Sequence, residues 1–154
     1  MLNIVLVEPL IPQNTGNIAR TCAAIGASLH IIKPIPFEIS DKTVKRAGLD
    51  YWQYLDIKIY ESLDNFLDMY KGNVFFFVET GSNLLYTEVE YKQDCFIFFG
   101  KETKGLSKEL LQSGLGTVVT IPTLDYIRSL NLSNAVAIVA YEAIRQNEGI
   151  NYKF

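Results

Sequence analysis

Residues 121–144, which read IPTLDYIRSLNLSNAVAIVAYEAI, join a short polar segment to a long apolar one. From Ala135 to Tyr141 there is no charge and no polar stripe at helical spacing. A helix that is apolar on every side is buried on every side. In a chain of 154 residues, such burial needs a central position or a second subunit. The stretch therefore predicts a helix over 132–147 that lies in the core or in a subunit interface.

The polar segment in front of this helix is crowded with hydrogen-bonding side chains. They are Arg128, Ser129, Asn131, Ser133 and Asn134. Ser and Asn at this place can cap the free N–H groups of a first helical turn. The positive end of the helix can equally hold an anionic or carboxylate-bearing ligand. A capped core helix explains part of the pattern, whereas the crowding favours a ligand site.

The composition fits one domain over residues 1–154. Hydrophobic residues make up 49% of the chain, which is ample for a core. The net charge of −3 excludes a strongly basic surface, so any RNA contact must come from local clusters such as Lys42, Lys45 and Arg46. No apolar run reaches about 18 residues, and residues 1–8 lack the basic start of a secretory leader. We expect neither a membrane span nor a leader.

Cysteine and histidine are too few for several classes of site. Cys22 and Cys95 lie in separate apolar patterns and are expected to be buried thiols, which indicates a reducing, cytoplasmic location. His30, the only histidine, lies in the apolar pattern of a strand. A histidine-based catalytic triad and a multi-histidine metal site are therefore excluded, and we expect no metal.

Short apolar runs alternate with helical patterns along the chain. Strands are expected at 3–8, 29–33, 57–60, 74–79, 95–100 and 118–122, and helices at 15–25, 42–47, 63–70, 107–113 and 132–147. The uninterrupted runs Val74–Val78 and Phe96–Phe99 are typical of strands buried on both faces. The alternation predicts an α/β fold with a mostly parallel sheet and helices on both faces. Ligands of such sheets bind at the carboxyl ends of the strands.

The loop after the first expected strand contains the segment PQNTGNIAR at 12–20. Asn14 or Thr15 can cap the helix that follows. Asn17 and Arg20, three residues apart, share a stripe that differs from the apolar stripe of this helix. An arginine in this position suits phosphate or carboxylate recognition. An ordinary surface arginine beside an Asn cap explains the segment equally well.

The loop at 99–107, FGKETKGLS, superficially matches a phosphate-binding loop. The lysine of such a loop directly follows its second glycine, where this chain has Leu106. The dinucleotide-binding glycine pattern is also missing after the first strand. What remains is a loop between Gly100 and Gly105 that allows close approach of a ligand to the backbone, with Glu102 inside it. An ordinary turn between a strand and a helix is the alternative.

Three segments together resemble a known family. Residues 14–20 (NTGNIAR), 99–106 (FGKETKGL) and 121–135 (IPTLDYIRSLNLSNA) are similar to the three motifs of the SPOUT superfamily of RNA methyltransferases, in its SpoU-like 2′-O-ribose branch. The motifs reach across almost the whole chain. Chain length, Glu8-Pro9 and residues 45–51 (KRAGLDY) narrow the resemblance to minimal members that methylate the wobble ribose, at cytidine or uridine 34, of certain leucine tRNAs.

The resemblance implies a C-terminal trefoil knot, an obligate homodimer, tRNA as partner and S-adenosylmethionine as cofactor. Carried over by position, the cofactor-binding residues are Val78, Gly100, Ile121, Ser129 and Leu130. One departure is Glu79, since relatives often have a neutral residue there. We expect Glu79 either to alter the loop on the cofactor side or to point to solvent.

The resemblance also implies methyl transfer to a ribose 2′-OH, with Arg20, Ser129 and Asn131 as catalytic residues. A guanidinium is effectively always protonated, so we expect Arg20 to orient a phosphate and to lower the pKa of the 2′-OH. Ser129 and Asn131 would fix the nucleophile, and Glu102 is a weaker candidate for proton acceptor or support. Other residues expected to bind or support the substrate are Asn14, Asn17, Lys45 and Arg46.

Two further functions remain as alternatives. The first is an RNA-binding dimer without methyl transfer, which the presence of Arg20, Ser129 and Asn131 disfavours. The second is 2′-O-methylation of ribosomal RNA, which keeps the chemistry and changes the substrate. The lack of an added RNA-binding domain favours a compact tRNA stem-loop.

Overall fold

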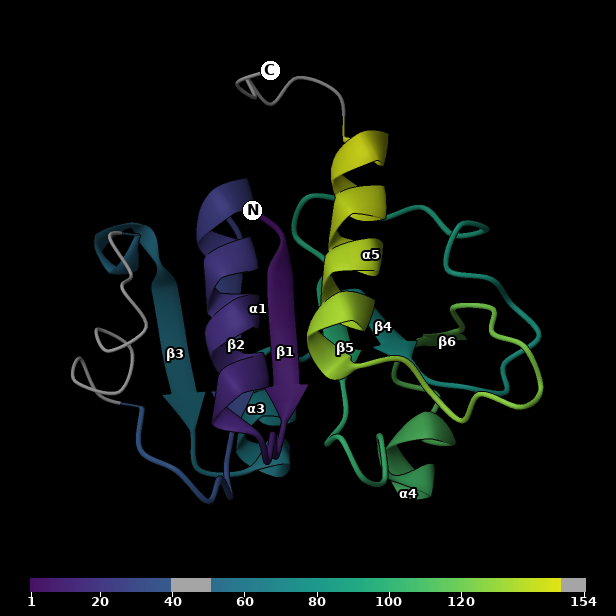
Figure 1. The fold of residues 1–154 in the computed structure, drawn as a ribbon, viewed down its shortest axis with the longest axis horizontal. Coiled ribbons are helices and arrows are strands. Elements are labelled where there is room, and N and C mark those ends of the chain that lie inside the picture. The colour runs from purple at the N-terminus through teal and green to yellow at the C-terminus, as the bar shows by residue number, and fades with distance from the viewer. Residues whose placement is uncertain (40–50, 148–154) are drawn as a thin grey trace.

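A parallel six-stranded sheet forms the centre of the computed structural model, which describes residues 1–39 and 51–147 (Figure 1). The strand order is β3-β2-β1-β5-β4-β6, and every pair is parallel. The strands are β1 (Asn3–Val7), β2 (Ser28–Ile32), β3 (Asp56–Tyr60), β4 (Phe75–Val78), β5 (Phe96–Phe99) and β6 (Thr117–Val119). The expected parallel α/β fold is confirmed, with strand ends that differ from the predicted ones by up to three residues.

The central strands are buried on both faces because successive side chains enter different cores. Ile4 and Leu6 of β1 belong to one apolar cluster, whereas Val5 and Val7 belong to the other. The same alternation divides the Phe-rich strands β4 and β5 between the two clusters. Since side chains alternate between the faces of a strand, an unbroken apolar run fills both cores at once.

Helices cover both faces of this sheet. Figure 1 shows α1 (Pro12–Ile25) and α5 (Leu132–Gln146) side by side on one face. The other face carries α3 (Leu63–Met69) and the short α4 (Lys108–Leu111), and a 3-10 turn, η1 (Trp52–Tyr54), precedes β3. The helix expected at 42–47 lies outside the described residues.

Helix α1 begins earlier than the sequence predicts, and neither Asn14 nor Thr15 caps it. Ile11 is the N-cap and makes no capping hydrogen bond with its side chain, and Pro12 occupies the first turn. Proline suits that position because its fixed φ is helical and its missing N–H is not needed there. Asn14 and Thr15 are instead buried inside the helix.

Helix α5 is only partly covered within the chain. Asn131 caps it, with Oδ1 accepting from Ser133 N at 2.9 Å and Asn134 N at 3.4 Å, as the capping interpretation predicts. Val139 is fully buried, so it lies in the core of the chain and not on an interface surface. Ile138 and Tyr141, by contrast, are 37% and 53% exposed. The apolar sequence therefore leaves an uncovered apolar stripe.

His30 is a buried residue of β2 with a structural role. Its ring nitrogens lie 2.8 Å from Tyr60 Oη and 3.1 Å from Asn3 Oδ1. Burial, assisted by the charge of Lys58, lowers the pKa of His30 to about 4, so the ring is neutral at physiological pH. Cys22 and Cys95 are buried free thiols, as expected.

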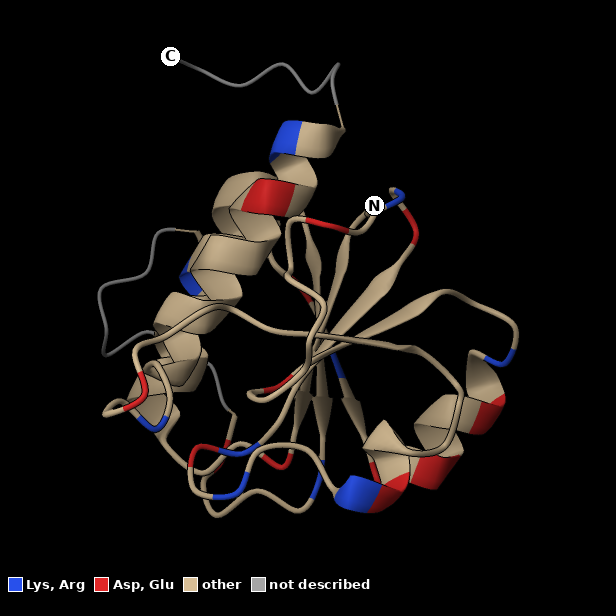
Figure 2. Cartoon of the chain, turned by 90° about the vertical axis from the view of Figure 1, so that its right-hand side faces the viewer, with Lys and Arg blue, Asp and Glu red and all other residues tan. Residues whose placement is uncertain are grey.

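Within residues 1–39 and 51–147, no helix has the length and apolar character needed to cross a membrane. The same residues contain no group of three or more His, Cys, Asp or Glu side chains arranged to hold a metal ion. Figure 2 shows Lys and Arg scattered among Asp and Glu on helices and loops.

Candidate active site

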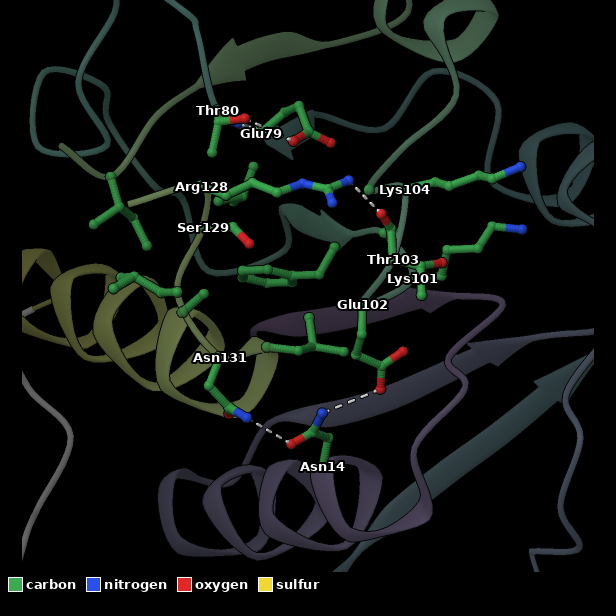
Figure 3. Close-up of a pocket in the computed structure, with 18 of the residues that line it drawn as sticks. Asn14, Glu79, Thr80, Lys101, Glu102, Thr103, Lys104, Arg128, Ser129 and Asn131 are labelled. Carbon is green, nitrogen blue, oxygen red and sulfur yellow. Dashed lines mark hydrogen bonds between the residues drawn. The ribbon is translucent and has the colours of Figure 1, made fainter. Parts of the chain in front are cut away.

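A cavity of about 270 Å³ opens at the carboxyl ends of β4 and β5, beside the first turn of α5 (Figure 3). Parallel sheets commonly bind their ligands at this edge. The lining consists of Ile11, Asn14, residues 78–80, residues 99–105, Ile121, Thr123, residues 128–132 and Ala135. The three loops singled out in the sequence therefore meet at one place.

All five residues assigned to the cofactor from the resemblance line this cavity. They are Val78, Gly100, Ile121, Ser129 and Leu130. Asn14, Glu102 and Asn131 line it as well. Arg20 and Asn17 are not part of the lining, and Lys45 and Arg46 lie outside the described residues.

Asn14, Glu102 and Asn131 form a hydrogen-bonded chain across the floor of the cavity (Figure 3). Asn131 Nδ2 donates to Asn14 Oδ1 at 3.1 Å, and Asn14 Nδ2 donates to Glu102 Oε1 at 3.2 Å. Asn131 Oδ1 is already engaged as the cap of α5. The chain therefore fixes the three loops relative to one another.

The Glu102 carboxylate serves the start of α1, which has no side-chain cap of its own. Oε2 accepts from Leu10 N at 2.8 Å, and Oε1 accepts from Ile11 N at 3.0 Å. Burial alone would raise the pKa of Glu102, but hydrogen bonds from these amides, its own backbone and Asn14 together lower it below the ordinary value of 4.5. A carboxylate stabilised in this way is a weak base, so the geometry favours the supporting role over proton acceptance.

Replacing Glu102 by Gln should destabilise the protein by about 1–3 kcal/mol at neutral pH, because an amide NH₂ would face a backbone donor. The folded pKa is depressed, so the carboxylate's contribution is fully present above pH 4.5 and is lost as the pH falls through the folded pKa. The gap in urea midpoint between wild type and Glu102→Gln should therefore shrink from pH 7 towards pH 3. A gap that stays constant over this range would contradict the assignment.

Gly100 is required by the loop itself. A Cβ on Gly100 would lie 2.0 Å from Gly105 C and 2.2 Å from Leu106 N. Gly105 has φ +65° and donates its N–H to Lys101 O at 2.8 Å, which folds the loop back on itself. The sequence hypothesis attributed this glycine to approach of a ligand, whereas the structure attributes it first to contact between two backbone segments.

Two cavity features were not assigned to the site from the sequence. The Arg128 guanidinium crosses to the opposite loop, where Nη2 donates to Thr103 O at 2.7 Å (Figure 3). Lys101 forms an ion pair with Glu8, whose φ of 52° is unusual for a residue other than glycine. Arg128 was named in the crowded segment but was given no role, whereas neither the backbone angle of Glu8 nor the partner of Lys101 has a sequence signal.

Arg20 lies on the outward stripe of α1, as predicted. It is exposed, whereas Ile18, Cys22 and Ile25 of the same helix are buried. Its guanidinium carbon lies 5.9 Å from the centre of the Tyr51 ring, whose hydroxyl donates to Gly16 O at 3.3 Å. Arg20 is therefore exposed beside Tyr51, and it does not line the cavity of its own chain.

Residues 1–141 match the model of the SpoU rRNA Methylase family. The chain belongs to this family. A Bacillus subtilis (strain 168) relative is 44% identical over 155 residues, covering 99% of this chain and 95% of its own, and is assigned provisionally as a tRNA (cytidine(34)-2′-O)-methyltransferase. A Saccharophagus degradans relative with the same assignment, not provisional, is 42% identical, covering 95% of this chain and 96% of its own.

Solved structures give the same family. One, from work on 2-OH methylation of C/U34 on tRNA, has a TM-score of 0.87 and 41% identity, covering 95% of each chain. Another, an AdoMet-bound rRNA methyltransferase from Sinorhizobium meliloti, has a TM-score of 0.81 and 26% identity, covering 94% of this chain and 56% of that one.

Proposed function

We propose that this protein transfers a methyl group from S-adenosylmethionine to the ribose 2′-OH of nucleotide 34 of tRNA, with leucine tRNAs as the expected isoacceptors. The observation that carries the proposal is similarity over nearly the full length to relatives assigned that activity. The cavity adds support, because it brings the three motifs of the resemblance together at one sheet edge.

The residues of the cavity fit S-adenosylmethionine. Its volume, about 270 Å³, lies near the lower end of the range for small-molecule sites. Val78, Ile121 and Leu130 give apolar walls, and the glycine-bounded loop at 100–105 exposes backbone groups. The cofactor supplies the electrophilic methyl group when bound. The protein must then hold the ribose in line with it and help remove the hydroxyl proton.

We assign a different role to each of the three catalytic residues named from the resemblance. Asn131 is occupied as the cap of α5 and as a donor to Asn14, so we assign it a positioning role. Ser129 lines the cavity, and we assign it the hydrogen bond to the 2′-OH. Arg20 provides the positive charge that orients the adjacent phosphate and lowers the pKa of the 2′-OH.

We further propose an obligate homodimer that packs through α1 and α5. These helices share one face of the sheet, and Ile138 and Tyr141 form an uncovered apolar stripe on α5. Because Arg20 projects outward from α1 and does not line the cavity of its own chain, we infer that it acts at the cavity of the partner protomer. The dimer would then be needed for catalysis as well as for stability.

Ile138→Asp should convert the dimer into monomers, because burying an unpaired carboxylate in an apolar interface costs several kcal/mol. Sedimentation at micromolar concentration measures the outcome. Met69→Asp is the matched control, since Met69 is 59% exposed on α3, on the opposite face of the sheet. A wild-type protein that sediments only as a monomer would contradict the dimer.

The proposal includes a trefoil knot formed by the C-terminal segments that line the cavity, and action in the cytoplasm, where reduced Cys22 and Cys95 are expected. Ribosomal RNA is the alternative substrate, which the family description favours. Incubation with labelled S-adenosylmethionine and unmodified tRNA or rRNA distinguishes the two. We expect label in tRNA. Label only in rRNA would show that ribosomal RNA is the substrate. No label in either RNA would refute methyl transfer.

A further inference from the structure

Glu79 is a carboxylate of the cavity that the proposed mechanism leaves unused. It directly follows β4 and lines the cavity beside Thr80. Its Oε2 accepts from Leu106 N at 2.8 Å, and its Oε1 accepts from Thr80 N at 3.0 Å. Two backbone donors therefore hold the carboxylate in one orientation. Of the two expectations for Glu79, these contacts favour an effect on the loop on the cofactor side.

The facing loop is shaped around this carboxylate. A Cβ on Gly105 would lie 2.1 Å from Glu79 Oε2 and 2.8 Å from Glu79 Cδ. The glycine thus makes room for the acid, in addition to adopting φ +65°. Figure 3 shows the carboxylate at the upper wall of the cavity, beside Thr80. Glu79 and Gly105 together form a preorganised acceptor site.

The two carboxylates of the cavity differ in the segments that their donors come from. A carboxylate offers about four lone-pair positions. Glu102 receives donors from Leu10, Ile11 and Asn14, and it is committed to the start of α1. Glu79 also receives three donors, namely Leu106 N, Thr80 N and, at 3.4 Å, Thr80 Oγ1, but these hold only the loops of the cavity itself. Among the contacts of the described residues, one acceptor position of Glu79 therefore remains for a ligand in the cavity.

We propose that Glu79 binds a hydrogen-bond donor group of the methyl donor, either the vicinal ribose hydroxyls or the α-ammonium group. The inference rests on the proposed function, because it requires S-adenosylmethionine in this cavity. Both groups are donors that a fixed carboxylate recognises. The carboxylate end of the same ligand would be repelled by Glu79, so the acid also sets the direction in which the ligand lies.

The test compares ligand pairs in wild type and Glu79→Gln by isothermal titration calorimetry. S-adenosylhomocysteine against its analogue without the amino group isolates the α-ammonium group, and 5′-methylthioadenosine against its 2′,3′-dideoxy analogue isolates the diol. A general loosening of the loop would weaken both ligands of a pair, so it cancels in the ratio of their affinities, as in a double-mutant cycle. Glu88→Gln is the matched control, because Glu88 also caps a backbone amide, that of Leu85 at 2.8 Å, but does not line the cavity.

For each pair, the affinity ratio is the affinity of the ligand that has the donor group divided by the affinity of the ligand that lacks it. We expect one of the two affinity ratios to be about tenfold lower in Glu79→Gln than in wild type, which is the loss typical of a hydrogen bond to a charged group. A fall in the first ratio identifies the ammonium group, and a fall in the second identifies the diol. Glu88→Gln should leave both ratios unchanged. If wild type binds the ligands and neither ratio changes in Glu79→Gln, the inference is overturned while the proposed function stands. If wild type binds none of them, the proposed function itself fails.

Discussion

Arg20→Ala should lower the rate of tRNA methylation by about 10²–10³-fold, as expected when one preorganised electrostatic contact to the transition state is removed. The fold should be unaffected, because Arg20 is exposed on the outward stripe of α1. S-adenosylmethionine should bind as in wild type, because we assign Arg20 to the RNA phosphate and the 2′-OH and not to the cofactor. Single-turnover methylation with saturating tRNA and cofactor, together with calorimetric cofactor affinity, measures both expectations.

Arg20→Lys is the discriminating companion variant. Lysine keeps the charge but loses the planar pair of donors, so it should restore little of the rate. Mixed dimers test the trans arrangement directly. A dimer that combines an Arg20→Ala chain with a chain defective in cofactor binding should regain one working site, since the intact Arg20 and the intact cavity then face each other. Turnover close to wild type in Arg20→Ala would reduce Arg20 to a surface residue.

Gly100→Val should abolish measurable binding of S-adenosylmethionine. The added side chain would begin with a Cβ 2.0 Å from the backbone of Gly105, so the loop at 100–105 must move. That movement displaces Glu102 from the start of α1 and alters one wall of the cavity at the same time. We expect the sheet to persist, because Gly100 follows β5 and lies outside it. Calorimetry and circular dichroism together distinguish a lost site from a lost fold.

Gly16→Ala is the control for this variant. A Cβ on Gly16 meets no atom within 4 Å, and the residue lies within a helix. Alanine there should raise stability by up to about 1 kcal/mol through its helix propensity. Cofactor affinity should not change. Unchanged cofactor affinity in Gly100→Val would remove the loop from the site.

The sheet and the meeting of the three motifs could be predicted because they follow from local patterns. Unbroken apolar runs such as Phe75–Val78 fill both cores, and a parallel sheet brings its loops to one edge. The resemblance then supplied the roles of Ser129 and Arg20. Local patterns could not predict which side chains make contacts with residues that are distant in the sequence. Glu102 caps a helix that begins 90 residues earlier by way of Leu10 and Ile11, and no sequence spacing marks that contact.

The errors in the prediction have the same origin. Asn14 and Thr15 have capping side chains, but Pro12 starts the helix before them. Val139 is apolar and central in α5, but only the position of α1 and the sheet decides that it is buried while Ile138 is not. Glu79 was recognised as a departure, but its orientation depends on Leu106 and Gly105, which lie on another loop.

The central claim is methyl transfer to one ribose, and mass spectrometry of nuclease fragments of leucine tRNA tests it most directly. Unmodified tRNA would be incubated with the protein and S-adenosylmethionine, digested, and mapped nucleotide by nucleotide. We predict a single added methyl group on the ribose of nucleotide 34, and about 10²–10³-fold slower formation of it in the Arg20→Ala reaction. A methyl group on a base, or on the ribose of another nucleotide only, would contradict it.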